Sequence, residues 1–310
     1  MPLAPGVHRR RPVVRTGRTC FDRRMIIEPS LVRGLIAAQF PQWSDLPVEA
    51  AGTGGTANAI YRLGADMSVR LPRTEGSAAD VATEHHWLPK LAPRLPFPVP
   101  TPLAQGAASE GFPRPWSVHT WLDGVNPAPG DATASSDLFA ADLAEFVLAL
   151  RRIDPQDAPP AYRAEPLASR DEATRTALAS VGGVVDVEAA TTEWKEALAA
   201  PPHTGRPVWV HGDLQPGNVL VDDGRLTAVI DFGCTGLADP AVDLIAAWYL
   251  LAPDARDTFR TALAPDDATW ARGRGWALSI ALLELAHYRE TDPRMARIAA
   301  HVIEELLHSR

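Results

Sequence analysis

Two polar motifs joined by a hairpin constrain the fold of this chain more than any other feature. The first, HGDLQPGN, occupies residues 211–218, and the second, IDFG, occupies residues 230–233. Apolar VWV precedes the first motif and VLV follows it, and Asp-Asp-Gly at 222–224 marks a turn before LTAVI leads into the second. The pattern predicts a strand, a polar loop, a hairpin and a second polar loop.

The polar side chains of these two loops suit phosphoryl transfer. Asp213 can accept the proton of an attacking hydroxyl, whereas Asn218 and Asp231 can bind a metal ion. If these residues only formed turns, nothing would explain why both motifs and the intervening hairpin fit one arrangement of polar loops. A metallophosphoesterase would need an upstream Asp-x-His pair and a histidine after the Asn; the pair is missing, and Val219 follows Asn218. The motifs therefore favour a small-molecule kinase.

With these motifs the chain resembles the aminoglycoside phosphotransferase-like kinases, which include macrolide kinases and, more distantly, choline and homoserine kinases. The resemblance rests on residues 211–218 and on IDFGCTGLADPAVDL at 230–244, and it extends over about residues 26–310. It implies an α+β, protein-kinase-like fold with a small antiparallel-sheet lobe over 25–120 and a mostly helical catalytic lobe over 121–310. The implied reaction moves the terminal phosphate of ATP or GTP, with Mg²⁺, to a hydroxyl of a small molecule.

The small lobe is expected to bind the nucleotide. Residues 48–72 predict three antiparallel strands, with turns at 52–57 and 64–66. Glycines in the first turn let main-chain amides approach phosphates closely, although an ordinary glycine-rich hairpin would look the same. These glycines are Gly52, Gly54 and Gly55.

The cation expected to hold the phosphates departs from the usual kinase pattern. The chain has two lysines, and neither lies on the third expected strand. Arg70 stands there instead, and the resemblance assigns it the phosphate-binding role with a changed geometry, because a guanidinium forks onto two oxygens. A helix is expected next, over 77–91, with Ser77 as its cap. By resemblance, Glu84 of this helix is the acid that pairs with Arg70.

The strand that crosses between the two lobes is expected at 115–124. In the family its main chain holds the purine edge, so the resemblance places four residues at the base pocket: His119, Thr120, Trp121 and Leu122. The Trp121 side chain either covers the base or packs as core. Because recognition at this hinge is mostly by main chain, the sequence leaves the choice between ATP and GTP open.

Three residues near the motifs are expected to support the site rather than to react. His211 is expected to support the Asp231 loop rather than to act as a general base. Asp239 comes at a helix start, where a carboxylate caps main-chain amides. The resemblance implies that Asp243, one helical turn further, hydrogen-bonds the catalytic loop.

Helices expected at about 268–290 and 294–308 should close one wall of the acceptor site. Polar side chains there would bind the ammonium groups of an aminoglycoside, or they simply belong to a solvated helix end. They include Glu284, His287 and Tyr288. Apolar neighbours would suit a macrolide or a nucleoside, or form core.

Charge and composition limit the partners. Residues 1–24 carry +6, which leaves −14 on the remainder of a chain with net charge −8. This basic segment has no aromatic interleaving and no amphipathic period, so we expect a disordered extension and no nucleic-acid partner. No apolar run approaches the ~20 residues of a membrane helix. The two cysteines offer no disulfide framework, which suits the reducing cytoplasm. We expect a monomer or a homodimer.

The expected acceptor is an antibiotic, namely an aminoglycoside, a macrolide or a nucleoside, whose phosphorylation gives resistance. A housekeeping kinase for choline, a sugar or an amino alcohol remains an alternative. So does a nucleotide-binding pseudokinase, for which the missing strand lysine is the argument. Fold likeness does not name the substrate.

Overall fold

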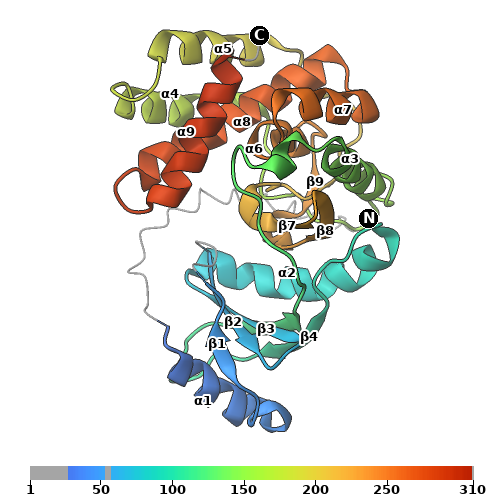
Figure 1. The fold of residues 1–310 in the computed structure, drawn as a ribbon, viewed down its shortest axis with the longest axis vertical. Coiled ribbons are helices and arrows are strands. Elements are labelled where there is room, and N and C mark those ends of the chain that lie inside the picture. Colours follow the sequence, from blue (N-terminus) through green and yellow to red (C-terminus); the bar gives the residue numbers. More distant parts are fainter. Residues whose placement is uncertain (1–26, 53–56, 309–310) are drawn as a thin grey trace, which may run out of the picture.

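An antiparallel sheet forms the lower part of the molecule in Figure 1, and helices form most of the upper part. The computed structural model describes residues 27–52 and 57–308, so the basic segment 1–24 and both Gly54 and Gly55 lie outside the described residues. The sheet has the strand order β1-β2-β3-β5-β4, with all neighbours antiparallel. Its strands are β1 (Val48–Ala50), β2 (Asn58–Leu63), β3 (Met67–Pro72), β4 (Pro102–Gly106) and β5 (Trp116–Thr120).

The two faces of this sheet differ because successive residues of a strand point to opposite faces. One face is apolar: Val69 and Trp116 share a buried core with helix α1 (Pro29–Gln39). On the other face, Arg70 points toward α2 (Glu75–Leu91), the helix that lies between the sheet and the rest of the molecule (Figure 1). The sheet thus presents a cation toward the helical part.

Helix α2 begins two residues earlier than predicted. Its N-cap is Thr74, on extended backbone, and Thr74 Oγ1 accepts a hydrogen bond from the Ser77 amide at 3.1 Å. The prediction that Ser77 is the cap was wrong, because Ser77 is a buried residue of the first turn. Either hydroxyl can cap a helix, and the acidic Glu75 also favours the earlier start.

Strand β4 has no counterpart among the expected strands. It begins at Pro102 on the edge of the sheet, where a proline removes no essential ladder hydrogen bond. The register against β5 shifts between Pro102 and Ala104. Prolines around this strand conceal it from a propensity-based prediction.

The helical part packs around one large hydrophobic core. Helix α8 contacts α4, α5 and α9, and buried tryptophans such as Trp276 fill the spaces between helices. No helix of the described ranges is long and apolar enough to span a membrane. The helices are α3 (Asp137–Arg151), α4 (Asp171–Ser180), α5 (Val187–Ala199), α6 (Ala246–Tyr249), α7 (Pro253–Leu263), α8 (Asp267–Tyr288) and α9 (Pro293–His308).

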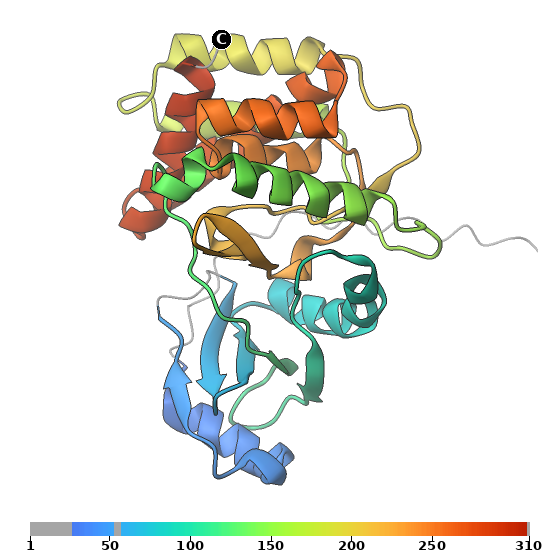
Figure 2. The same ribbon diagram turned by 45° about the vertical axis from the view of Figure 1, so that its right-hand side comes forward.

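Two small sheets lie between the large sheet and most of the helices, where Figure 2 shows the β7–β8 ribbon. Strand β6 (Val208–Val210) pairs with β9 (Gly236–Ala238), and β7 (Val219–Asp222) pairs with β8 (Arg225–Val229). The hairpin predicted between the two motifs is therefore present. Its neighbours in the chain, the β6–β7 loop and the β8–β9 loop, carry the polar motif residues.

Candidate active site

The β6–β7 loop holds Asp213 by contacts within the loop itself. Asn218 ends a short 3-10 helix, η5 (Pro216–Asn218), and its Nδ2 donates to Asp213 Oδ2 at 2.9 Å and to the Asp213 carbonyl at 2.8 Å. Gln215 Nε2 donates to Asp213 Oδ1 at 3.1 Å. The Asp213 side chain remains 25% exposed, so its carboxylate is oriented and still accessible.

Asp243 supports the start of this loop from beneath. Its two carboxylate oxygens accept the amides of His211 and Gly212, at 2.9 and 2.8 Å. Burial raises the pKa of Asp243, because its side chain has no access to water. The His211 ring is also held at both nitrogens: Nε2 donates to the Ile230 carbonyl at 3.1 Å, and Nδ1 accepts the Asp213 amide at 3.2 Å. The ring therefore joins the two loops.

Gly212 allows the two loops to touch. Its φ of +83° lies in the left-handed region, and a Cβ there would come within 2.7 Å of the Cys234 carbonyl oxygen. Any larger residue would separate the loops. The Gly of the HGD triplet thus sets the distance between the Asp213 loop and the Asp231 loop.

Asp231 lies on the β8–β9 loop in an unusual backbone conformation. Its φ is +62°, a left-handed geometry that Asp tolerates better than most residues. Its Oδ1 accepts a hydrogen bond from Arg70 Nη2 at 3.0 Å, while 34% of the side chain remains exposed. Burial opposes ionisation, but Arg70 outweighs it and holds the pKa of Asp231 below its usual value.

Arg70 connects three elements of the site. Its Nη1 contacts both Glu84 oxygens, at 2.9 and 3.1 Å, and Glu84 Oε1 also accepts the Phe232 amide at 3.0 Å. Burial raises the pKa of Glu84 to about 7, against the opposing effect of Arg70. Burial also disfavours the charge on Arg70, yet its two carboxylate partners prevail and raise its pKa. One guanidinium thus ties β3, α2 and the Asp231 loop together.

Of the four residues expected at the base pocket, His119 is entirely buried on β5. Its ring lies 5.6 Å from that of His85 on α2, and neither of its nitrogens has a hydrogen-bond partner within the described ranges. Burial lowers the pKa of His119 to about 2, with Arg70 acting in the same direction. His119 is therefore a buried, neutral ring between β5 and α2.

The other three hinge residues follow directly along the chain. Thr120 Oγ1 accepts the Thr101 amide at 2.9 Å, and the Trp121 amide donates to a carbonyl of the β2–β3 turn at 2.7 Å. The Arg62 guanidinium lies 4.8 Å from the centre of the Trp121 ring. In the part of the chain that the structure describes, the Leu122 amide has no hydrogen-bond acceptor. A free donor at the hinge is thus the Leu122 amide.

Glu284 of α8 reaches the catalytic loop. Its Oε1 accepts Gln215 Nε2 at 2.8 Å, the same nitrogen that contacts Asp213, and its Oε2 accepts Tyr249 Oη at 2.8 Å. Burial raises the pKa of Glu284 to about 7, which the hydrogen bonds from Gln215 and Tyr249 only partly oppose. Gln215 therefore links Asp213 to a carboxyl group whose pKa is raised to about 7.

His287 and Tyr288 lie at the end of α8, where their rings meet edge to face at 4.6 Å. Of the three acceptor-site residues expected from the sequence, Glu284 accepts a hydrogen bond from Gln215 of the Asp213 loop. Asp239 accepts the Ala241 amide at 2.9 Å and pairs with Arg272, whose Nε is 2.6 Å from Oδ2. Asp239 therefore anchors a turn to α8.

The sequence analysis missed Arg163. Its Nη1 donates to Asp213 Oδ1 at 3.1 Å and also to the Gly212 carbonyl. The side chain is 11% exposed, so the cation is nearly buried beside Asp213. Arg163 belongs to the loop between α3 and α4, which has no motif and no periodicity. Gln215 and Tyr249 were also missed, although Gln215 lies inside the HGDLQPGN motif.

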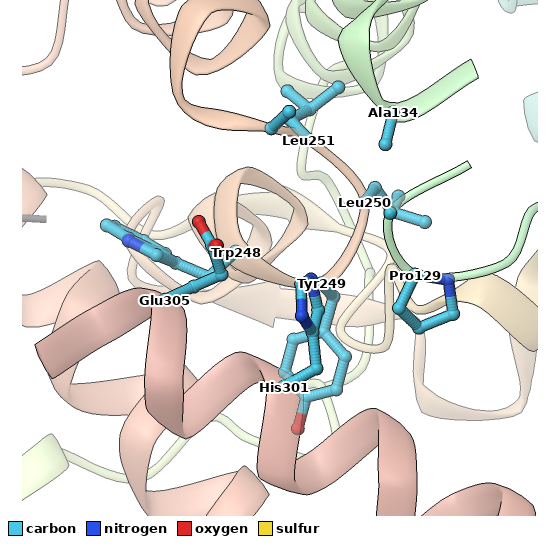
Figure 3. Close-up of a pocket in the computed structure, with 10 residues that line it drawn as sticks. Pro129, Ala134, Trp248, Tyr249, Leu250, Leu251, His301 and Glu305 are labelled. Carbon is cyan, nitrogen blue, oxygen red and sulfur yellow. The ribbon is translucent and has the colours of Figure 1, made fainter. Parts of the chain in front are cut away.

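A partly open cavity of about 90 Å³ lies next to this network rather than at Asp213. Figure 3 shows residues that line it, from the loop around Pro129, from α6 and its continuation, and from α9. Tyr249 lines the cavity with its ring and donates to Glu284 with its hydroxyl. The cavity lining includes none of the motif residues.

Comparisons with known proteins place the chain in a family. The model of a family described as "Phosphotransferase enzyme family" matches residues 50–276. An aminoglycoside 3'-phosphotransferase of Escherichia coli is 38% identical over 58 residues, which are 19% of this chain and 21% of that protein. Serine/threonine-protein kinase SULU of Caenorhabditis elegans is 33% identical over 81 residues, 26% of this chain and 8% of that protein. The chain thus spans a small part of these curated relatives.

Solved structures match over nearly the whole chain. The GDP complex of wild-type aminoglycoside 2'-phosphotransferase-IIIa has a TM-score of 0.73 at 21% identity, covering 91% of this chain and 99% of the other. A macrolide 2'-phosphotransferase of Brachybacterium faecium has a TM-score of 0.58 at 23% identity, covering 89% and 97%. These likenesses confirm the predicted α+β, protein-kinase-like fold. Together with the family match, they show that the chain belongs to the phosphotransferase enzyme family.

Proposed function

We propose that this protein transfers the terminal phosphate of ATP or GTP, with Mg²⁺, to a hydroxyl of an antibiotic of the aminoglycoside or macrolide type. The observation that carries this proposal is the contact between the Asp213 loop and the Asp231 loop at Gly212. It brings an accessible carboxylate and the Arg70–Asp231 pair to one cleft. Phosphoryl transfer needs these groups together, because it depends on positioning and charge neutralisation.

Asp213 acts on the acceptor hydroxyl. A carboxylate offers about four acceptor positions. Within the described ranges, Oδ1 accepts two side-chain donors, Arg163 and Gln215, whereas Oδ2 accepts Asn218 alone. The open position on Oδ2 can therefore receive the acceptor hydroxyl and, as the new bond forms, its proton.

Asn218 and Asp231 suit a magnesium ion. Because Asn218 Nδ2 faces Asp213, its amide oxygen points the other way and is available as a ligand. The described residues contain no group of three or more His, Cys, Asp or Glu side chains placed to bind a metal. Mg²⁺ commonly uses only one or two protein oxygens besides phosphates and water. When bound, the ion would neutralise charge on the phosphates.

The nucleotide would lie between the hinge and Arg70. The Leu122 amide, which donates to no main-chain acceptor within the described residues, is a donor for the edge of the base. Arg70 is directed at the phosphates by Glu84, and Gly52, with a φ of +55°, begins the turn that would approach them. A purine ring and the phosphate chain thus have partners on both sides of the cleft.

The acceptor class rests on the relatives and on Glu284. The similar structures include aminoglycoside and macrolide phosphotransferases. Glu284 lies one side chain away from Asp213, so an acceptor with an ammonium group near its hydroxyl would meet a carboxyl group, and the ammonium would favour its ionised form. A small amino alcohol would fit the same description, which makes choline and similar metabolites the alternative acceptors to test.

The first prediction tests the reaction itself. The purified protein, with Mg²⁺ and ATP or GTP, should add one phosphoryl group to a member of a panel of aminoglycosides, macrolides, nucleosides and amino alcohols, detected by mass spectrometry. Asp213→Asn should abolish transfer and leave Mg-nucleotide affinity within about threefold, because it removes the proton acceptor and no nucleotide contact.

Asp222→Asn is the matched control, since it changes an exposed carboxylate on the adjacent β7–β8 hairpin. It should behave like the wild type. Transfer retained by Asp213→Asn would exclude the role of Asp213. Tight Mg-nucleotide binding without a product from any acceptor would favour a pseudokinase.

A further inference from the structure

Arg163 makes the least expected contact in the site, and it reaches Asp213 from a segment outside both motifs. We propose that Arg163 is a positioning residue for the phosphoryl transfer inferred above, on which this proposal rests. By bridging the Gly212 carbonyl and Asp213 Oδ1, it holds the carboxylate in the orientation that leaves Oδ2 open to the acceptor hydroxyl.

The backbone of the Arg163 segment is attached to the metal-binding side of the site. The Leu237 amide donates to the Pro159 carbonyl at 2.8 Å, and the Ala161 amide donates back to Leu237 at 3.0 Å. The Tyr162 amide donates to the Cys234 carbonyl at 3.1 Å. These bonds make the segment a neighbour of β9, so the position of the Arg163 side chain follows from a hydrogen-bonded backbone.

Gly236 makes this attachment possible. Its φ is +157°, and a Cβ there would lie 2.5 Å from the Ala161 nitrogen and 2.6 Å from the Pro159 oxygen. Only a residue without a side chain lets the segment approach β9 so closely. The same short motif region, 230–238, therefore carries Asp231 and also admits the support for Asp213.

The charge of Arg163 and the number of hydrogens on its Nη1 both suit this role. Burial works against the charge on Arg163, but the Asp213 carboxylate outweighs it and raises the pKa of Arg163. Arg163 therefore stays protonated throughout the pH range of the reaction. Nη1 carries two hydrogens, one for each of its two acceptors, Gly212 and Asp213. A buried ion pair with these additional hydrogen bonds restricts rotation of the carboxylate.

Steady-state kinetics of Arg163→Met tests the proposal, because methionine keeps the length and removes the charge. We expect kcat to fall about 10²-fold, as for a misplaced catalytic group. The acceptor KM and the Mg-nucleotide Kd should stay within about threefold of the wild-type values, because Arg163 binds neither substrate. Arg163→Lys restores the charge but not the planar geometry, and should recover part of kcat.

Arg170→Met is the matched control: it removes a cation of the following 3-10 helix, η4 (Leu167–Arg170), that pairs with Glu165 instead of Asp213. Its kcat should stay within about threefold of wild type. If Arg163→Met does not fold, Arg163→Lys decides: reduced kcat with unchanged KM supports the role.

A variant of Arg163 with wild-type or higher kcat would overturn the proposal while leaving the phosphotransferase function intact. Equal losses in Arg163→Met and Arg170→Met would do the same, because they would indicate a general charge effect. If the wild type binds Mg-nucleotide but phosphorylates no acceptor, the proposed function fails, and the positioning role fails with it.

Discussion

The two sides of Asp213 are built on different principles. On the nucleotide side, Arg70 forms ion pairs with Glu84 and Asp231, so two carboxylates share one buried cation. On the acceptor side, Glu284 is held by the neutral donors Gln215 and Tyr249. Burial raises the pKa of Glu84 and of Glu284 alike, to about 7. Two carboxyl groups with the same raised pKa can therefore have different partners: a buried cation for Glu84, and neutral hydrogen-bond donors for Glu284.

Glu84→Gln should produce the largest change in stability. It leaves the buried Arg70 with Asp231 as its remaining carboxylate, and removing one partner of a buried ion pair costs about 3–5 kcal/mol of unfolding free energy. Urea unfolding followed by circular dichroism measures this loss. Glu145→Gln, which changes an exposed acid of α3, is the control. Equal stability of the two variants would mean that the Arg70 cluster contributes no more than a surface pair.

Asp231→Asn should have the next largest effect, on nucleotide binding. Asparagine also tolerates the φ of +62° at this position, so the backbone should be kept while the charge is lost. We expect the Kd for Mg-nucleotide to rise roughly 10²-fold, which corresponds to about 2.7 kcal/mol. Isothermal titration calorimetry with and without Mg²⁺ makes the measurement. An unchanged Kd would remove Asp231 from the metal site.

Glu284→Gln should have the smallest effect on stability and the clearest effect on its pH dependence. The pKa of Glu284 is raised in the folded protein, from 4.5 to about 7, so between these values the folded state holds a proton that the unfolded chain has released. The unfolding free energy therefore falls as pH rises from about 4.5 to about 7, and changes little above that.

The glutamine variant should lose the Glu284 part of this slope, at a cost of about 1 kcal/mol because one of the two donors around residue 284 loses its acceptor. Unfolding curves at several pH values across this window provide the data. An identical slope in wild type and variant would mean that Glu284 does not titrate there. Glu84, whose pKa burial also raises to about 7, contributes to the slope that remains.

The motif residues could be placed from the sequence because they are close together in the chain. A hairpin of known type separates Asn218 from Asp231, so their proximity follows from local structure. The general fold followed as well, through strand periodicity and the resemblance to a kinase family. The start of α2 was misplaced because Thr74 and Ser77 are both good caps, and β4 was missed because prolines mask an edge strand.

The roles of Arg70 and Glu84 remain predictions, although the structure brings the two side chains together at 2.9 Å. So do the roles of the hinge residues, where the structure adds that His119 is buried and that the Leu122 amide is free within the described ranges. No pattern of residue types in the sequence could have shown that His119 is buried while the Leu122 amide is free within those ranges. Burial depends on the packing of β5 against α2, which is a property of the assembled sheet.

By itself, the sequence determined the hairpin between the two motifs, the general two-lobe fold, and the identity of the polar groups in the two loops. Those features depend on neighbouring residues, whose turn chemistry and periodicity are written in the chain. Only the tertiary structure decided that Arg163 and Glu284, 50 and 71 residues away from Asp213, lie around one carboxylate. Buried polar groups must find partners wherever the fold supplies them, and contacts across such separations leave no periodic trace.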